Sequence, residues 1–483
     1  MNPKTNSLVA LALTVGALSP ASSWAFDAIC QAPELVSWGG GTVEYMVYVG
    51  DAAEDDFFES GYDLDQDGDT DLVLAGAFYP YRGEWSGEPS DDSVILINQG
   101  NKQFIKASGD VPKGVHPREI LYADFDANGL IDFFVADHGY DAEPFPGYSN
   151  SLMLQFEDGW VDASERLPDD QHGFTHNAAV GDVDGDGDPD LFVFNNGSPP
   201  EGNMKYWLIN DGAANFVVDT SLMPDSFPAS GEFEAKWDSW FTELADFDAD
   251  GFLDLLVGGT TGPYANGESR IYWGGANGFS DGRVTLLGLE GAVAALNVDT
   301  VQVISSLSED VNGDGHLDLV LGGYDGSFRS RFTQLWMNTG SREFVDQTNS
   351  RLGPLATQSS SAWHQEFSWF DFNGDGYFDI VPRLNGEGET EVIAWLGDGA
   401  GYFHALSGET VGDDELLTRL GKTYIHSSGE LFSMEFFSYE GRLTANAGVV
   451  SNGTEIKRFP CPLSVLPPLT PVQKVGLEAE LLP

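Results

Sequence analysis

The sequence has very few positive charges. Lys and Arg together number 22, against 77 Asp and Glu in 483 residues, which gives a net charge of −55 at neutral pH. A field of that sign repels the phosphates of nucleic acids and of anionic membranes, so the composition argues against both as partners. Hydrophobic residues make up 41% and aromatic residues 12% of the chain, so it is not disordered despite its charge. Solubility in salty surroundings would explain the acidity, and so would the binding of cations.

Long apolar runs and cysteines are also scarce. Residues 1–25 have the pattern of a signal peptide, with Lys4 before the apolar run at 8–18, and no later segment is long and apolar enough to span a bilayer. The only cysteines are Cys30 and Cys461. In an oxidising compartment they most simply pair, and two buried free thiols are the alternative. We therefore expect an exported protein, either periplasmic or extracellular.

What the sequence does contain is one acidic nonapeptide six times over. The pattern D-x-[DN]-x-[DN]-G-x-x-D begins at residues 63, 124, 182, 246, 310 and 371, so successive copies start 58 to 64 residues apart. Calcium takes six to eight oxygen ligands, and carboxylates two residues apart on a tightly curled loop converge on one ion. Glycine at position 6 permits the sharp turn, and position 7 contributes only its backbone carbonyl. No Cys or His recurs in the ligand columns, which argues against zinc.

Each loop is therefore predicted to hold one calcium ion, up to six in all. The predicted ligands are the residues at positions 1, 3, 5, 7 and 9 of the loops 63–71, 124–132, 182–190, 246–254, 310–318 and 371–379: Asp63, Asp65, Asp67, Asp69, Asp71, Asp124, Asp126, Asn128, Leu130, Asp132, Asp182, Asp184, Asp186, Asp188, Asp190, Asp246, Asp248, Asp250, Phe252, Asp254, Asp310, Asn312, Asp314, His316, Asp318, Asp371, Asn373, Asp375, Tyr377 and Asp379. An EF-hand would need a Glu at position 12 and a helix after the loop. Each loop instead runs into a short apolar segment rich in β-forming residues.

The remainder of each repeat predicts two further strands. About 25 to 35 residues after each loop comes an apolar segment, a Gly or Asn turn and an aromatic residue such as Trp160, Phe216 or Phe344. Four strands in about 60 residues correspond to one blade of a β-propeller, with these aromatics packing between blades. We expect an all-β, seven-bladed propeller of four-stranded blades over residues 26–459, in which six blades carry the loop and a degenerate seventh lies near residue 432.

The two ends of the chain are expected to close this ring. The segment 42–50 has strand character and precedes the first blade, so it is predicted to be donated to the last blade. The N- and C-terminal segments would together complete that blade, and a bridge between Cys30 and Cys461 would lock the closure. Residues 460–483, rich in Pro and Leu, are predicted to form an irregular tail.

The repeated loop followed by an apolar strand, at a period of about 60 residues, resembles the FG-GAP/VCBS repeats, whose best-known members are the propellers of integrin α chains. No Phe-Gly dipeptide occurs in the chain, so it is more similar to the bacterial VCBS type. The resemblance implies a seven-bladed, calcium-binding, extracytoplasmic propeller. It implies no single activity, because members include adhesion domains, lectin-like modules and domains attached to polysaccharide-active enzymes.

Candidate ligand-binding residues lie in the connections opposite the acidic loops. Strand alternation puts all the loops on one face, and the longer, irregular and aromatic connections on the other, where loops on a rigid scaffold commonly carry function. The candidates on that face are His116, His138, Tyr140, Asp141, His172, His176, Trp237 and Trp363. The alternative is that the histidines hydrogen-bond their own loops and that the tryptophans pack at loop roots.

Three functions remain open on this basis. The favoured one is a monomeric binding or adhesion module for a protein or glycan. A carbohydrate-active enzyme similar to a polysaccharide lyase, with the histidines around blades two and three as its base, is the alternative. Such a lyase needs positive groups to neutralise a uronate, which this chain has in short supply, and no Gly-x-Ser-x-Gly or His-Glu-x-x-His motif occurs. A purely structural protein of the cell envelope is the third.

Overall fold

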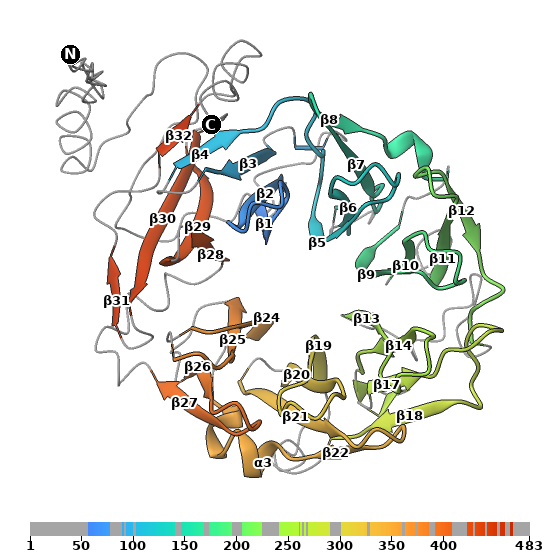
Figure 1. Ribbon diagram of the computed structural model, residues 1–483, viewed down its shortest axis with the longest axis vertical. Helices are drawn as coiled ribbons and strands as arrows, with labels where there is room; N and C mark the ends of the chain where they lie inside the picture. The colour runs from blue at the N-terminus through green and yellow to red at the C-terminus, as the bar shows by residue number, and fades with distance from the viewer. Residues whose placement is uncertain are drawn as a thin grey trace, which may run out of the picture.

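The structure is a computed structural model in which the strands form a ring of antiparallel sheets (Figure 1). It describes residues 57–77, 89–90, 93–99, 103–140, 146–168, 173–195, 205–224, 241–259, 261–262, 265–266, 269–289, 301–325, 329–359, 363–372, 375–385, 392–407, 423–427, 430–439, 442–451, 455–458 and 464–466. Among these residues, no helix is long and apolar enough to cross a membrane.

Six of the sheets are four-stranded meanders that each contain one acidic loop between the first two strands. Their strands are β1 (Phe57–Tyr62), β2 (Asp71–Gly76), β3 (Val94–Asn98) and β4 (Gln103–Lys106); β5 (Pro117–Ala123), β6 (Asp132–Asp137), β7 (Ser151–Phe156) and β8 (Gly159–Asp162); β9 (Thr175–Gly181), β10 (Asp190–Asn195), β11 (Lys205–Asn210) and β12 (Phe216–Asp219); β13 (Thr242–Ala245), β14 (Asp254–Val257), β17 (Ser269–Tyr272) and β18 (Val284–Leu287); β19 (Val301–Glu309), β20 (Asp318–Asp325), β21 (Arg331–Asn338) and β22 (Phe344–Asp346); and β24 (Trp363–Phe370), β25 (Asp379–Asn385), β26 (Val392–Gly397) and β27 (Phe403–Ser407).

Several short elements lie beside these sheets or in their connections. The strand β23 (Thr357–Gln358) pairs with β21, and β15 (Thr261–Gly262) pairs with β16 (Ala265–Asn266). Three single-turn helices lie in the connections of the second and fifth sheets: η1 (Ser164–Arg166), α3 (Thr348–Arg351) and η2 (Pro354–Ala356). The chain is therefore an all-β propeller of four-stranded blades, as the repeats predict.

The number of blades differs from the expected seven. Side-chain packing is described for six of the sheets, and each of these contains an acidic loop between its first two strands. Counted in this way, the propeller has six blades. A further four-stranded antiparallel sheet follows the sixth blade in the chain and spans the region expected to hold the degenerate seventh; its strands are β28 (Thr423–Ser427), β29 (Glu430–Tyr439), β30 (Arg442–Ser451) and β31 (Glu455–Arg458). It has no acidic loop, and its side chains lie outside the described residues.

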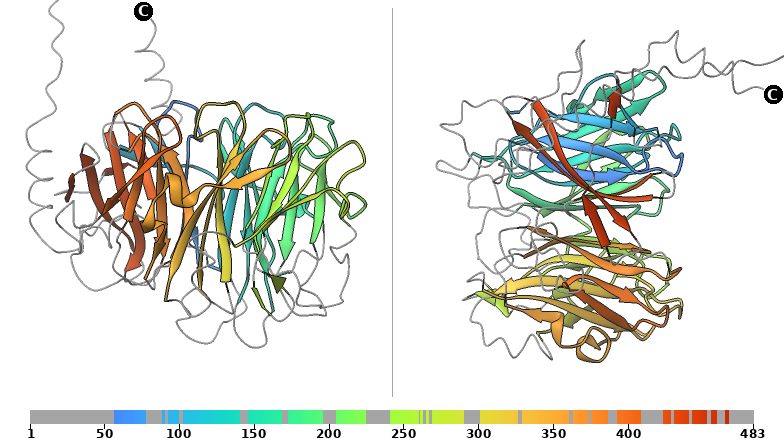
Figure 2. Two further views of the ribbon diagram at one scale, coloured as in Figure 1. Left: turned by 90° about the horizontal axis from the view of Figure 1, so that it is seen from below. Right: turned by 90° about the vertical axis from the view of Figure 1, so that its left-hand side faces the viewer.

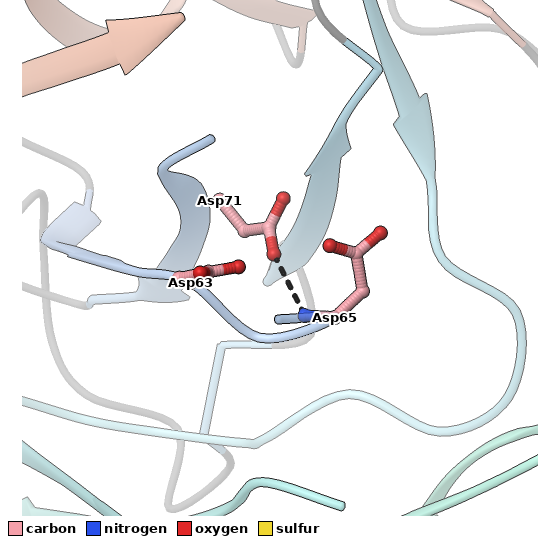
Figure 3. Close-up of side chains that lie close together, drawn as sticks. All are labelled: Asp63, Asp65 and Asp71. Carbon is pink, nitrogen blue, oxygen red and sulfur yellow. Dashed lines mark hydrogen bonds between the residues drawn. The ribbon is translucent and has the colours of Figure 1, made fainter. Parts of the chain in front are cut away.

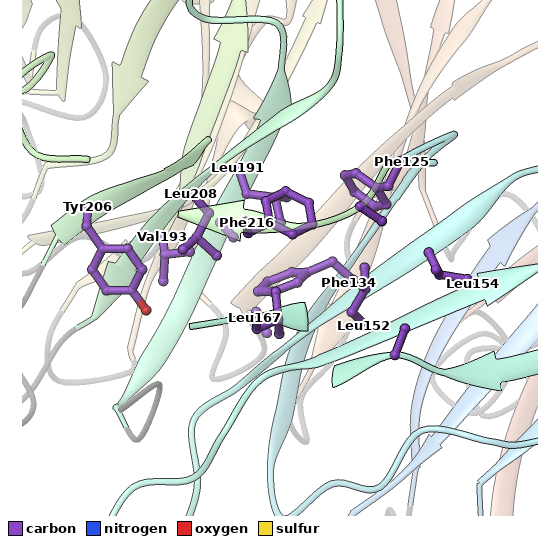
Figure 4. Close-up of a cluster of buried hydrophobic side chains, with 14 residues drawn as sticks. Phe125, Phe134, Leu152, Leu154, Leu167, Leu191, Val193, Tyr206, Leu208 and Phe216 are labelled. Atoms are coloured by element: carbon purple, nitrogen blue, oxygen red, sulfur yellow. The ribbon is translucent and has the colours of Figure 1, made fainter. Parts of the chain in front are cut away.

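The first strand of each blade faces the centre of the ring, and several neighbouring first strands contact one another (Figure 1). Seen edge-on, the strands run between the two faces of the disc (Figure 2). The hydrophobic core is divided into clusters, each shared by two neighbouring blades. The cluster between blades two and three joins Phe134 and Leu152 to Leu191 and Leu208 (Figure 4). The blades are therefore held side by side by apolar burial.

The aromatic residue of each second hairpin belongs to these clusters. Trp160 packs between blades one and two, Phe216 between blades two and three, and Phe344 between blades four and five. Phe216 meets Phe125, at position 2 of the second loop, with ring centroids 5.7 Å apart in an edge-to-face arrangement. The predicted packing role of these three aromatics is confirmed.

The C-terminal part of the chain joins the first blade. Strand β32 (Ser464–Leu466) pairs in parallel with β4 at the outer edge of that blade. The C-terminal segment therefore adds a strand to the first blade and not to the last, which corrects the expected closure and places a strand in the expected tail. The segment 42–50 and the pair Cys30 and Cys461 lie outside the described residues.

Candidate metal loops and the opposite face

The six acidic loops share one hydrogen-bonding pattern. The Asp at position 1 accepts hydrogen bonds from the backbone N–H groups of positions 5 and 6, at 2.8–3.1 Å in every loop. The side chain at position 5 accepts the N–H of position 7, at 2.7–3.0 Å. These bonds curl each loop so that its acidic side chains face inward.

The glycine at position 6 is required by this curl. Its φ angle lies between +86° and +99° in all six loops, a region that side chains other than glycine rarely adopt. The six residues are Gly68, Gly129, Gly187, Gly251, Gly315 and Gly376. The turn predicted at position 6 is thus present in each copy.

Position 9 has a second role that the sequence pattern did not reveal. The six carboxylates there have no exposed surface: Asp71, Asp132, Asp190, Asp254, Asp318 and Asp379. In each, Oδ1 accepts the N–H of a residue at or just after the end of the blade's third strand, at 2.7–2.9 Å. In five of them, Oδ2 accepts the N–H of position 2, at 2.7–3.0 Å. The carboxylate therefore ties the loop to the third strand.

Burial disfavours the charged form of these carboxylates and so raises their pKa values. It raises the pKa of Asp71 to about 8 and of Asp132 to about 7, although backbone N–H groups oppose the rise. Burial likewise raises the pKa of Asp254 and Asp318 to about 7, and that of Asp190 to about 6. The nearby loop acids raise these pKa values further through repulsion. A cation at the loop would favour the charged forms.

The side chains can supply the oxygens that a hard cation needs. In the first three loops, carboxylates at positions 1, 3 and 9 offer oxygens that lie within 4.8 Å of one another, as do those at positions 1, 3 and 5 of the fourth loop. Figure 3 shows the first of these groups, in which the Asp65 N–H donates to Asp71 at 3.2 Å. An all-oxygen set of this kind fits calcium or another hard divalent ion.

At position 7, two of the side chains are largely exposed. Phe252 and Tyr377 are 42% and 50% exposed, so the predicted carbonyl ligands at this position stay a prediction. His316 and Tyr377 each lie against a glycine in the second hairpin of their blade: a Cβ on Gly340 would lie 2.4 Å from His316 Nε2, and one on Gly399 would lie 2.4 Å from Tyr377 Cδ1. The imidazole of His316 therefore lies against the turn glycine Gly340, whose φ is +75°.

The fifth and sixth loops contain Asn at position 3. The Asn312 amide donates to the Asp314 carboxylate at 3.0 Å and to Asp318 at 3.4 Å, so it links loop acids. Asn373 lies outside the described residues. Asn offers a single oxygen where the other four loops have a carboxylate, and this lowers the charge available to a cation.

The structure brings together three of the predicted ligand-binding residues on the opposite face. His138 lies between His116 and His176, with ring centroids 5.3 and 4.3 Å away, and its ring also meets Phe174 at 4.8 Å. Burial lowers the pKa of His138 to about 3, and it holds the pKa values of His116 and His176 well below the usual range, with the charge of Arg118 acting in the same direction. The three imidazoles are therefore neutral at pH 7.

Of the other predicted residues, the structure describes Tyr140 and the backbone of Trp363. Tyr140 is half-buried and forms a bridge with Gly147. Trp363 begins β24 opposite Asn385, and its side chain is outside the described part of the chain. Nothing is described for the remaining three: Asp141, His172 and Trp237.

One further residue, Arg118, belongs to the histidine cluster but was not found from the sequence, and Tyr324 of another blade lies within range of its charge. The Nη1 of Arg118 lies 3.2 Å from His116 Nε2, and the Arg118 charge also acts on Tyr324 of blade five. Burial raises the pKa of Tyr324 to about 12, and its hydroxyl donates to Gln302. The sequence did contain one signal for Arg118, because it is one of few cations and lies at the start of the first strand of a blade. Tyr324 comes within range of the Arg118 charge only because the blades form a ring, so no pattern in the sequence indicates it.

Comparisons with known proteins agree on the repeat. The model of the FG-GAP-like repeat matches residues 63–135, 124–193, 182–257 and 310–381. A curated relative, the phosphatidylinositol-glycan-specific phospholipase D of Dictyostelium discoideum, is 28% identical over 166 residues, which are 29% of this chain and 17% of that protein. The chain thus spans less than a fifth of that relative.

Two solved structures match this chain at low similarity. The Vibrio cholerae biofilm matrix protein Bap1 has 11% identity and a TM-score of 0.30, with 83% of this chain and 78% of that chain covered. The Aleuria aurantia lectin, solved in complex with α-methyl-L-fucoside, has 10% identity and a TM-score of 0.32, with 83% and 98% covered. Because the repeat model accounts for more than half of the residues, this chain belongs to the FG-GAP-like repeat family.

Proposed function

We propose that this protein is an exported, calcium-stabilised β-propeller that binds a protein or glycan through the face opposite the acidic loops. The observation that carries the proposal is the division of polar groups between the two faces. The loop acids are engaged with the blades' own backbone. The buried histidines and Arg118, by contrast, gather at the opposite ends of the strands of blades two and three.

The domain organisation is part of this proposal. Residues 1–25 would be the signal peptide and 26–459 the propeller, with 460–483 as the C-terminal segment. We take β28–β31 as the seventh blade, because it is a four-stranded antiparallel meander and β28 and β29 contact β1 of the first blade. Six loop-bearing blades and one without a loop would then complete the ring.

Calcium is proposed as the ion because the loops offer only oxygen ligands in a flexible arrangement. At ten times its dissociation constant, each bound ion would add about 1.4 kcal/mol to stability. Thermal unfolding in calcium and in EDTA tests this, and we expect a clear fall in melting temperature on chelation. An identical melting temperature in both buffers would refute a stabilising role for calcium.

Ligand binding at the opposite face can be tested with one variant and a matched control. A panel of neutral and uronate-containing glycans is screened against the wild type, Arg118→Gln and Arg166→Gln. Arg166 contacts the carbonyl of Ala213 in a hairpin turn on the loop side, so its loss should not affect binding. We expect Arg118→Gln to weaken binding at least tenfold. Full binding by this variant would place the ligand elsewhere, and no binding by the wild type would favour protein partners.

A second candidate, a polysaccharide lyase, is favoured by one specific observation. Neutral histidines lie beside a guanidinium, with a tyrosine hydroxyl within range of the same charge. Arg118 would bind the uronate carboxylate, and a histidine would remove the proton at C5. The C4–O bond would then break, leaving a C4–C5 double bond, while the leaving oxygen takes a proton from Tyr324, which solvent restores.

The ultraviolet absorbance of that new double bond distinguishes the two candidates. If the protein is a lyase, absorbance rises with a uronate polymer, and His116→Ala and His176→Ala lose this activity. A wild type that binds such a polymer without any rise in absorbance is a binding module. Unchanged turnover in both variants would exclude these two histidines as the base.

A further inference from the structure

We infer that the fourth acidic loop carries its own cation: the guanidinium of Arg342, from the adjacent blade, occupies the oxygens that the other loops offer to calcium. This inference rests on the proposed role of calcium at the loops. It predicts that the loops differ in occupancy although their sequences are alike. The fourth loop would then remain without calcium when the first three are filled.

The contacts of Arg342 are with the acids at positions 3 and 5. Its Nε binds the Asp248 carboxylate, and its Nη2 lies 3.0 Å from Asp250 Oδ2. The other oxygen of each acid, Oδ1, accepts a backbone N–H of the loop, from Asp250 at 3.1 Å and from Phe252 at 3.0 Å. The guanidinium therefore takes the two oxygens that the loop backbone leaves for a metal.

The turn between β21 and β22 holds Arg342 in this place. Its φ is +60°, and its carbonyl accepts the Thr285 hydroxyl at 2.9 Å. Its guanidinium also lies 5.1 Å from the ring centroid of Trp273. The contacts on the side chain and on the backbone fix where the charge is placed.

The equivalent turns of blades three and six have no side chain that could reach a loop. Two residues before the hairpin aromatic, where blade five has Arg342, blade three has Ala214 and blade six has Gly401. These residues share the positive φ, at +58° and +76°. The backbone thus has a similar conformation in the three turns. Among them, only the turn of blade five places a cationic side chain against the loop of the preceding blade.

A fixed guanidinium and a calcium ion cannot use the same oxygens without penalty. Both are positive, so an ion at the centre of the fourth loop would be repelled at short range and would lose two carboxylate oxygens. The converging acids of this loop also differ: they come from positions 1, 3 and 5, whereas the first three loops use positions 1, 3 and 9. The contact of both Asp248 and Asp250 with the one guanidinium of Arg342 accounts for this difference.

Counting bound calcium tests the inference directly. The wild type, Arg342→Ala and Arg342→Gln are equilibrated with calcium at a concentration that saturates the wild type, and bound metal per chain is measured by atomic emission. We expect each variant to bind one more ion than the wild type. Ala214 shows that alanine is accommodated at this backbone position, and circular dichroism checks that each variant is folded.

Three control proteins separate charge and position from a general effect. Arg342→Lys keeps the positive charge and should gain no ion. Arg351→Ala removes another cation beside a hairpin turn, one that donates to the carbonyls of Ala400 and Gly401, and should leave the count unchanged. Adding Asp250→Asn to Arg342→Ala should abolish the gain, because the extra ion would need that carboxylate.

The outcomes also separate this inference from the calcium proposal. Equal counts above zero in the wild type and Arg342→Ala overturn the inference and leave the calcium role standing. A lower count in Arg342→Ala also overturns it and makes Arg342 a residue that positions metal ligands. Zero in both proteins overturns both statements.

Discussion

The neutral state of His138 makes the stability of the protein depend on pH. Its pKa is about 3 in the folded chain, against about 6.5 in an unfolded one, so below pH 6.5 the unfolded state binds more protons. Stability from this residue is complete above pH 6.5 and falls as the pH drops towards 3. At pH 5 the loss is about 2 kcal/mol.

Urea unfolding of the wild type and His138→Gln at pH 7 and pH 5 measures this loss. The free energy of unfolding of the wild type should fall by about 2 kcal/mol more than that of the variant between the two pH values. The buried acids that titrate in the opposite direction, such as Asp137, are common to both proteins and cancel in the comparison. His404→Gln, at an exposed position, should behave as the wild type does. Parallel pH profiles for the wild type and His138→Gln would contradict the prediction.

Single residues were predictable from sequence where their role is local. Glycine at position 6 of the loop follows from a turn closed within six residues, and the structure has the expected conformation in every copy. Arg342 could not be found in this way, because its partner Asp248 lies 94 residues earlier in the chain. Arg118 and Tyr324 are likewise brought together only by the ring. A repeat of about 60 residues does not indicate which side chains of different blades contact one another.

The blade depends on the carboxylate at position 9, which joins its loop to its third strand. Asp132 accepts the N–H of Phe125 at 2.9 Å and that of Gln155 at 2.7 Å. In Asp132→Asn an amide N–H₂ would face one of these donors, which leaves a buried group without a partner. We expect a loss of about 2 kcal/mol in the free energy of unfolding.

Measurement in EDTA at pH 8 separates this structural role from any role in metal binding. At that pH the wild-type carboxylate is charged, since its pKa is about 7. Asp126→Asn is the matched control, because Asp126 accepts only an N–H within the loop, from Asn128 at 3.2 Å. That variant should lose less than about 0.5 kcal/mol. Equal losses in the two variants would show that position 9 acts only as a ligand.

Strands were more predictable than their assembly. The acidic loop and the second hairpin each mark two strands, so four strands per repeat follow from local patterns, and β5–β8 or β9–β12 match them. Local patterns do not predict which strand pairs at the outer edge of a blade, because any short apolar segment satisfies the same pattern. Strand β32 pairs with β4, although its sequence, rich in Pro and Leu around it, gave no strand signal.

At the scale of the whole molecule, β32 connects the end of the chain to the first blade. Ser464, Val465 and Leu466 pair in parallel with Gln103, Phe104 and Ile105. Closing a ring in this way means that the first blade cannot separate from the last without breaking the added strand. The ladder also covers the edge of β4, which would otherwise present unpaired backbone groups.

Val465→Pro should open this closure, since proline removes a backbone donor and fits poorly inside a ladder. With about two hydrogen bonds lost, the free energy of unfolding should fall by about 2 kcal/mol. Hydrogen exchange should show faster exchange of the β4 amides and unchanged exchange in β7, which lies in the next blade. Val465→Ala keeps the backbone pairing and should leave β4 protected. If β4 remains equally protected in Val465→Pro, the ring is held by the packing between blades alone, and the C-terminal strand is not needed to close it.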